Sequence, residues 1–200
     1  MIETGALQAA APPTPFDSTG MPRMVAYNNG AVEVTNTVVQ TDVLTKLCTP
    51  NTQTLIGGTG FLFLANTFAV GKIYTFKTWG YLTCSGVAAS PIWAMFFNAA
   101  NPLTSETNNL SVTTTRKPFN YEVSFYFETL GVAAQMHISS IVPNGNANTS
   151  AAQIRGVEQA TFFVIDTTIN QTVFIKNYWS AAVSPTNKIY TAGASVTITD

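Results

Sequence analysis

The sequence contains very few charged side chains. Asp, Glu, Lys and Arg make up 10% of its 200 residues, against about 25% in an average soluble protein. Thr, Asn, Ser and Ala take their place. The formal net charge is −1, and the sequence lacks the clusters of Lys and Arg that nucleic-acid binding requires. We therefore expect a neutral polar surface, part of it covered by other subunits, and no nucleic-acid partner.

Side chains that ligate metals or act in catalysis are also scarce. The chain has one histidine, His137, and two cysteines, Cys48 and Cys84, which lie in separate segments without Cys-x-x-Cys spacing. This set is too small for a zinc site, so we expect neither a metal nor a cofactor. In a reducing compartment, two thiols that act as small apolar residues are favoured over a Cys48–Cys84 disulfide. The pairing of the two cysteines stays open.

Long apolar runs are absent as well. No run approaches the roughly 18 residues of a membrane span. The N-terminus carries Glu3 and lacks a basic region followed by an apolar core, which is the pattern of a signal peptide. We expect no membrane span and no signal peptide, and synthesis in a cytoplasm follows as the default.

Residues 61–84 predict a strand, a tight corner and a long strand. Residues 61–64 form an apolar run that is too short for a helix, and Gly71 supplies a backbone that can take positive φ. From residue 73 to residue 82 the chain is aromatic and β-branched, as is typical of strands. We expect Trp79 and Tyr81 to reach the core.

The clearest alternation of apolar and polar residues runs from residue 119 to residue 127. A period of two predicts a strand of an antiparallel sheet with one face buried. In residues 134–138 the pattern repeats, with Met136 and Ile138 inward and His137 outward, and Gly131 predicts a hairpin between the two strands. The residues expected on the inner face of the first strand are Phe119, Tyr121, Val123, Phe125 and Phe127.

The rest of the chain predicts further short strands and no convincing helix. About eight to ten strands are expected in all, which favours an antiparallel β-sandwich or jelly roll. Residues 1–30, with prolines at 12, 13 and 15, predict an extended N-terminal arm, with a disordered tail as the alternative. The sandwich is expected to occupy residues 31–200. Further strands are expected at 31–40, 41–47, 91–98, 108–115, 160–165, 173–179 and 194–198, and loops at 98–107 and 143–148.

Two stretches resemble the jelly-roll domains of phage tail and spike proteins and of other virion proteins. FLFLANTFAVGKIYTFKTWGYLTC, residues 61–84, is similar to the first half of those domains, and IDTTINQTVFIKNYWSAAVSPTNKIY, residues 165–190, is similar to their closing segment. The similarity covers roughly residues 60 to 200. Residues 176–178 are more polar and bulkier than in the family, and the first 60 residues match no part of it. The resemblance implies an all-β, single jelly roll of the TNF-like viral type, usually trimeric.

A catalytic site is not expected, and we expect no enzyme. His137 is the histidine that a Ser-His-Asp triad would need, and it is expected to point outward or into an interface. Glu122 and Glu128 share one strand face but lie roughly 20 Å apart, too far for the carboxylate pair of a glycosidase. Asp166 predicts a turn cap. The sequons at Asn109, Asn148 and Asn170 are expected to carry no glycan without a secretion signal.

Two function classes remain. The first is a viral structural protein, a jelly-roll subunit of a spike, fibre, tail tip or capsid that self-assembles and can contact a host receptor. A homotrimer is favoured over a pentamer, and a pentamer would indicate a capsid vertex (penton) protein. The arm would contact other virion proteins. The second class is a carbohydrate-binding module of a virion, in which loop aromatics and amides contact a host-surface glycan. In both cases the expected location is the virion, after synthesis in the host cytoplasm.

Overall fold

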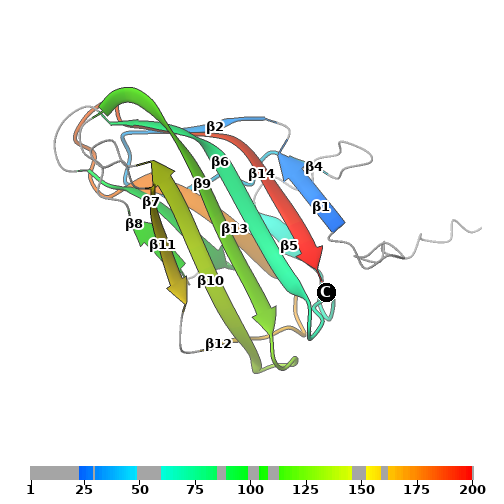
Figure 1. Ribbon diagram of the computed structural model, residues 1–200. Coiled ribbons are helices and arrows are strands. Elements are labelled where there is room, and N and C mark those ends of the chain that lie inside the picture. Colours follow the sequence, from blue (N-terminus) through cyan, green and yellow to red (C-terminus); the bar gives the residue numbers. More distant parts are fainter. Residues whose placement is uncertain are drawn as a thin grey trace, which may run out of the picture.

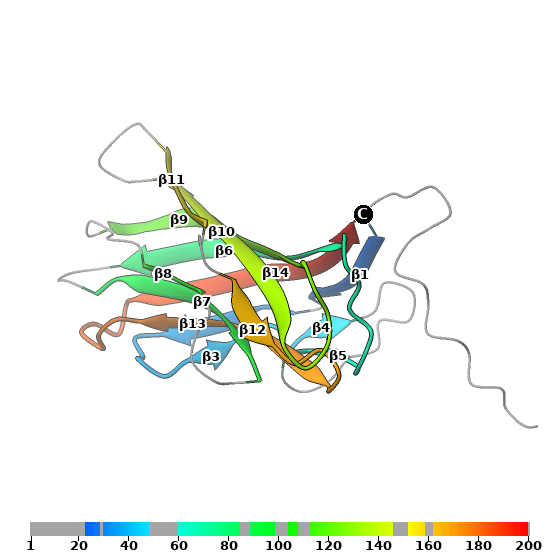
Figure 2. The ribbon, with the colours of Figure 1, turned by 90° about the horizontal axis from the view of Figure 1, so that it is seen from below.

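The protein is described from a computed structural model, which covers residues 23–28, 30–48, 60–84, 89–98, 104–107, 113–145, 152–158 and 162–199. Within these ranges the chain forms strands and no helix. The strands build two antiparallel sheets that pack face to face (Figures 1 and 2). The strands are β1 (Arg23–Asn28), β2 (Val32–Thr35), β3 (Thr41–Asp42), β4 (Leu47–Cys48), β5 (Phe61–Phe63), β6 (Ile73–Cys84), β7 (Pro91–Phe97), β8 (Thr104–Thr107), β9 (Thr113–Phe127), β10 (Ala134–Gly145), β11 (Ala152–Glu158), β12 (Phe163–Ile165), β13 (Gln171–Trp179) and β14 (Lys188–Thr199).

The two sheets differ in size. The larger sheet has the order β11-β10-β9-β6-β14-β1-β4, and the smaller sheet has the order β3-β13-β7-β8. Three long strands have one edge shared by two short strands, an arrangement that we call a split edge. β1 and β2 share an edge of β14, β3 and β5 share an edge of β13, and β11 and β12 share an edge of β10. The chain is therefore an antiparallel β-sandwich, as expected.

The core lies between the sheets and is rich in aromatic rings. All five residues expected on the inner face of β9, from Phe119 to Phe127, are buried, and so are Met136 and Ile138 of β10. The ring of Phe125 lies at the centre, stacked on Tyr74 with their centroids 5.1 Å apart and edge-on to Phe97 at 5.3 Å. Because Tyr74 belongs to the larger sheet and Phe97 to the smaller one, Phe125 links the two layers.

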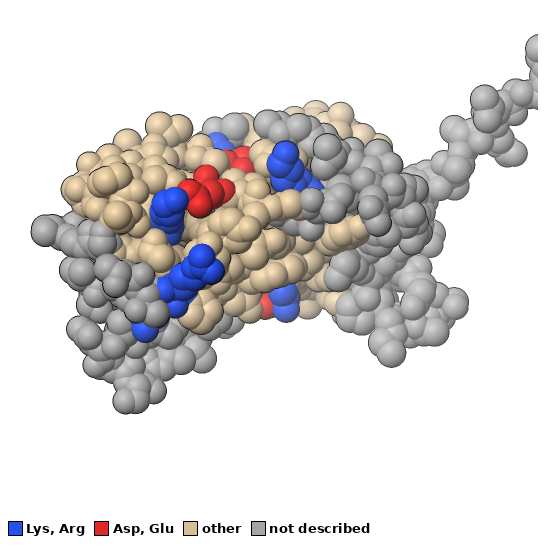
Figure 3. Space-filling model, turned by 90° about the horizontal axis from the view of Figure 1, so that it is seen from above, with Lys and Arg blue, Asp and Glu red and all other residues tan. Residues whose placement is uncertain are grey.

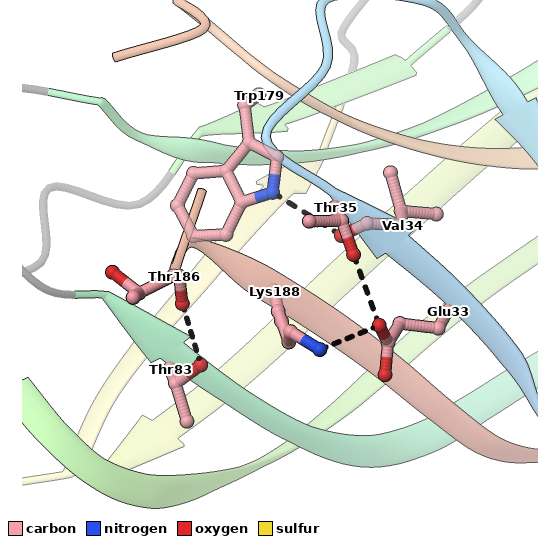
Figure 4. Close-up of polar contacts among 7 residues, drawn as sticks. All are labelled: Glu33, Val34, Thr35, Thr83, Trp179, Thr186 and Lys188. Carbon is pink, nitrogen blue, oxygen red and sulfur yellow. Dashed lines mark hydrogen bonds and ion pairs between the residues drawn. The ribbon is translucent and has the colours of Figure 1, made fainter. Parts of the chain in front are cut away.

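At one end of the sandwich, β2 is fixed to its neighbours by side chains as well as by its backbone (Figure 4). The indole Nε1 of Trp179, which is fully buried, donates to the carbonyl oxygen of Val34 over 3.5 Å. Glu33 accepts from the Nζ of Lys188 at 2.8 Å and from the hydroxyl of Thr35 at 3.0 Å. Nearby, the hydroxyl of Thr83 at the end of β6 donates to the carbonyl of Thr186 at 3.0 Å. These bonds secure the short strand where few backbone pairs are available.

The prediction for Trp79 and Tyr81 is wrong. In β6 the even-numbered residues Tyr74, Phe76 and Leu82 face the core. Side chains alternate across a strand, so the odd-numbered ones lie on the outer face of the larger sheet. Trp79 is 43% exposed.

Several boundaries also differ from the predictions. The sheet begins at Arg23, not at residue 31, because β1 pairs with both β14 and β4; residues 1–22 lie outside the described part. The loops expected at 98–107 and 143–148 overlap β8 and the end of β10. Strand β11 had no counterpart among the predictions.

Candidate functional sites

The outer face of the larger sheet carries a group of residues that we call the aromatic strip: Trp79, Tyr81, Arg116, Asn120 and Tyr190. Tyr81 and Tyr190 are cross-strand partners of β6 and β14, and their rings stack with centroids 4.7 Å apart. The guanidinium of Arg116, on β9, lies 4.6 Å from the centroid of Tyr81. Asn120 is the cross-strand partner of Trp79 and is exposed. The strip therefore combines planar rings with amide and guanidinium donors on one face.

Gly193 and an irregularity in β14 make room for the indole of Trp79, and Gly80 allows the close approach of β6 to the backbone of β14. The register between β6 and β14 shifts between Thr191 and Gly193, so that Ala192 is an extra residue in the ladder. A Cβ at Gly193 would collide with the Cζ2, Cε2 and Nε1 atoms of Trp79, and one at Gly80 would collide with the carbonyl oxygen of Tyr190. The indole thus lies against bare backbone. Bulges of this kind commonly re-aim a side chain, and glycine within a strand often marks a close approach.

Ion pairs flank the aromatic strip along β6 and β14. The Nζ of Lys77 lies 2.9 Å from Oε2 of Glu122, and the Nζ of Lys188 lies 2.8 Å from Oε1 of Glu33. The hydrogen bond from Lys188 is the main reason why the pKa of Glu33 lies below its ordinary value. Both pairs are largely exposed. In Figure 3 the charged residues form small separate clusters in a face that is otherwise uncharged among the described residues.

A second surface lies at the end of the sandwich formed by the β5–β6, β9–β10 and β12–β13 connections, at the bottom of Figure 1. The three connections are joined by backbone hydrogen bonds, from Asn66 N to the carbonyl of Thr167 and from Thr167 N to the carbonyl of Gly131, both 2.9 Å long. We call this surface the apolar end. Its exposed large apolar residues are Leu64, Val70, Leu130, Val132 and Ile169.

The apolar end has fewer charged residues than exposed large apolar ones. Its three connections carry Lys72, Glu128 and Asp166 as their charged residues. Val132 is the most exposed of its apolar side chains, at 74%. Contiguous exposed apolar surface beyond a few hundred Å² is uncommon on monomers and marks interaction sites. The opposite end has a matched residue in Val39, which is 66% exposed in the β2–β3 connection.

His137 lies outward on β10, as expected. Its ring stacks on Tyr126 with centroids 5.0 Å apart, and its Nε2 lies 3.2 Å from Oε1 of Glu128. Glu122 of β9 pairs instead with Lys77, so Glu122 and Glu128 have different partners. The structure does not bring Glu122 and Glu128 together into one site.

The turn-capping prediction for Asp166 is confirmed. Its Oδ1 accepts from the backbone N of Thr168 at 2.9 Å and from the Thr168 hydroxyl at 2.6 Å. Of the three sequon asparagines, Asn170 accepts from the backbone N of Ala65 at 2.9 Å. Asn109 and Asn148 lie outside the described residues.

Burial raises the pKa of two titratable groups, Asp42 and Cys84. Asp42 accepts from the backbone N atoms of Leu44 and Gly60 at 3.1 and 2.6 Å, yet burial raises its pKa above the ordinary value. Burial also raises the pKa of the Cys84 thiol. The side chain of Cys48 lies outside the described part, so the disulfide question stays open.

The aromatic strip is absent from the sequence-based predictions, because these place Trp79 and Tyr81 in the core. The available signal was the alternation of Tyr74, Phe76 and Leu82, which fixes the opposite face as outward. The apolar end gave no periodic signal, since its residues come from three separate connections.

Comparison with known proteins adds no family to these observations. Among the described residues, no group of three His, Cys, Asp or Glu side chains could hold a metal ion, and no helix could cross a membrane. No family model matches the chain, and no curated protein or solved structure is significantly similar to it.

Proposed function

We propose that this protein is a jelly-roll structural subunit of a virion, and that it self-associates through its apolar end. The order of the strands carries the proposal. In a jelly roll, eight strands lettered B to I alternate between two sheets with the orders B-I-D-G and C-H-E-F. The orders β1/β2-β14-β6-β9 and β3/β5-β13-β7-β8 match these two patterns when the split edges serve as strands B and C.

The remaining strands are additions to this plan. β10, β11 and β12 extend the larger sheet beyond β9. Along the sequence, they lie between β9 and β13, which correspond to strands G and H. β4 adds to the other edge of that sheet by pairing with β1. The eight-strand pattern is undisturbed by them, since they join at the outer edges.

Self-association is supported by the chemistry of the apolar end. A monomer would leave its valine, leucine and isoleucine side chains in water, and a symmetric assembly buries such a patch against copies of itself. A trimer is the form that the resemblance to phage jelly-roll domains implies. That resemblance also supports a position in a spike, fibre or tail tip, with residues 1–22 as the arm toward other virion proteins.

Sedimentation velocity of the purified chain at micromolar concentration tests the proposal. We expect a trimer that persists at high salt, because an apolar interface offers few charge pairs to be screened. Val132→Lys should shift the protein toward monomer, whereas Val39→Lys, at the opposite end, should leave the assembly intact.

A wild-type monomer would refute self-association, and so would equal effects of the two lysine variants. A ring of five would move the assignment from spike to capsid vertex. A carbohydrate-binding module remains the second candidate, because of the aromatic strip.

A further inference from the structure

The side chain of Trp79 is a large aromatic group that is exposed on the outer face of the larger sheet. The Cζ2, Cε2 and Nε1 atoms of the ring lie against the bare backbone at Gly193, so the backbone of β14 helps to fix the position of the indole. An exposed tryptophan fixed in this way loses little conformational freedom when a planar group stacks on it. The negative face of an aromatic ring attracts polarised C–H groups, which line one side of a pyranose ring.

A second planar group lies one step further along the same strand. Successive outward residues of a strand are about 7 Å apart, so a ligand longer than one sugar ring can reach both positions. Tyr81 occupies this step, between the ring of Tyr190 and the guanidinium of Arg116. Asn120 lies beside Trp79 and supplies an exposed amide that can donate to and accept from hydroxyl groups.

We propose that the aromatic strip binds a carbohydrate chain, with one pyranose ring against Trp79 and its neighbour against the outer edge of the stack of Tyr190, Tyr81 and Arg116. Asn120 and Arg116 donate to the sugar hydroxyl or carboxylate groups. A few polar groups placed around aromatic side chains are typical of sites that fix the orientation of a small ligand. This site is separate from the apolar end, so it does not depend on self-association.

The charges on the strip favour a sugar over a nucleic acid. Single-stranded nucleic acids also stack on aromatic side chains, but they require a positive groove along the backbone. Here Lys77 and Lys188 are each paired with a glutamate, and Arg116 is the remaining cation among the described side chains of the strip.

Trp79 itself reports on the site. The chain has three tryptophans, and the other two, Trp93 and Trp179, are fully buried. Quenching by acrylamide should therefore act mainly on Trp79. We would titrate the full-length protein with neutral oligosaccharides of glucose, mannose or galactose, and with carboxylated ones, oligogalacturonate and sialyllactose. A ligand on the indole should protect it from the quencher and shift its emission to shorter wavelength.

Three variants and one control separate the strip from the rest of the surface. Trp79→Ala should weaken binding by about tenfold or more, as measured by calorimetry. Asn120→Ala and Arg116→Ala change exposed residues and should also weaken it, so the test stands even if Trp79→Ala folds poorly. Tyr126→Ala is the control, because Tyr126 lies on the same sheet face with 42% exposure and outside the strip.

Each possible result either supports or overturns the carbohydrate proposal. Binding of either a neutral or a carboxylated oligosaccharide that the three strip variants weaken supports the proposal and identifies the sugar class. It is overturned if no oligosaccharide binds at concentrations on the order of millimolar, or if Tyr126→Ala weakens binding as much as Trp79→Ala. It is also overturned if protection of Trp79 requires an oligothymidine, or if Trp79→Ala changes only the sedimentation of the protein, which would assign the strip to a second copy of the chain.

Discussion

Replacing Phe125 by alanine should be among the most destabilising single changes in this protein. Its ring is almost fully buried and meets six other aromatic rings at centroid distances between 5.1 and 6.4 Å. Those rings are held by both sheets, so the cavity left by the substitution cannot close easily. Phe→Ala in a core typically costs about 3–5 kcal/mol, and we expect the upper half of that range. The rings around Phe125 belong to Phe63, Phe68, Tyr74, Phe76, Phe97 and Phe127.

Ser124→Ala, at the adjacent outward position, is the matched control. The Ser124 hydroxyl makes a hydrogen bond of 2.8 Å with the hydroxyl of Thr75 on β6. Its loss should cost about 1 kcal/mol, well below the cost of emptying the Phe125 position.

Urea unfolding of both variants, followed by circular dichroism, measures the two costs. The protein concentration must be equal in all samples, because association contributes to apparent stability. Equal losses of unfolding free energy for the two variants would refute the assignment of inner and outer faces in β9. If Phe125→Ala lowers the free energy of unfolding only slightly, the core around Phe125 is loosely packed.

Two further predictions concern Asp42 and the N-terminus. Burial raises the pKa of Asp42 in the folded protein above 3.8, so the folded protein binds this proton more tightly than the unfolded chain does. The contribution of Asp42 to the free energy of unfolding is therefore complete below about pH 4 and is lost as pH rises through the folded pKa. Urea midpoints between about pH 3 and about pH 7 should fall less steeply in Asp42→Asn than in the wild type, and parallel profiles would contradict this. A chain that starts at Arg23 should fold like the full-length protein, whereas one that starts at Asn29 lacks β1 and should unfold at lower urea; equal midpoints would show that β1 contributes nothing to the sandwich.

The β-sandwich could be predicted because its central strands have one apolar face. The alternation from Phe119 to Phe127 fixed both the strand and its buried side, and the hairpin at Gly131 followed from a single glycine between two alternating segments. These are local signals, and antiparallel neighbours in sequence convert them directly into structure.

Other features depend on partners that are distant in sequence. The alternation in β6 places Trp79 outward, but its close approach to Gly193 depends on the register of β6 against β14 and on the extra residue Ala192. No local pattern in β6 encodes that register. The stretch PNGNAN, residues 143–148, predicts a loop, yet pairing with β11 extends β10 to Gly145. The split edges combine short strands from separate segments, and each piece is too short to give a periodic signal.

The split edges also bear on how this protein avoids uncontrolled aggregation. A long, continuous outer strand exposes a row of unpaired backbone N–H and C=O groups that can recruit another chain into a fibril. Among the described residues, the outermost strands are β4, β8 and pieces of all three split edges, and each is short or interrupted. A neighbouring chain would find no more than a few consecutive backbone partners before the strand ends. A chain rich in aromatic and β-branched residues can thus be present at high local concentration without adding strands edge to edge.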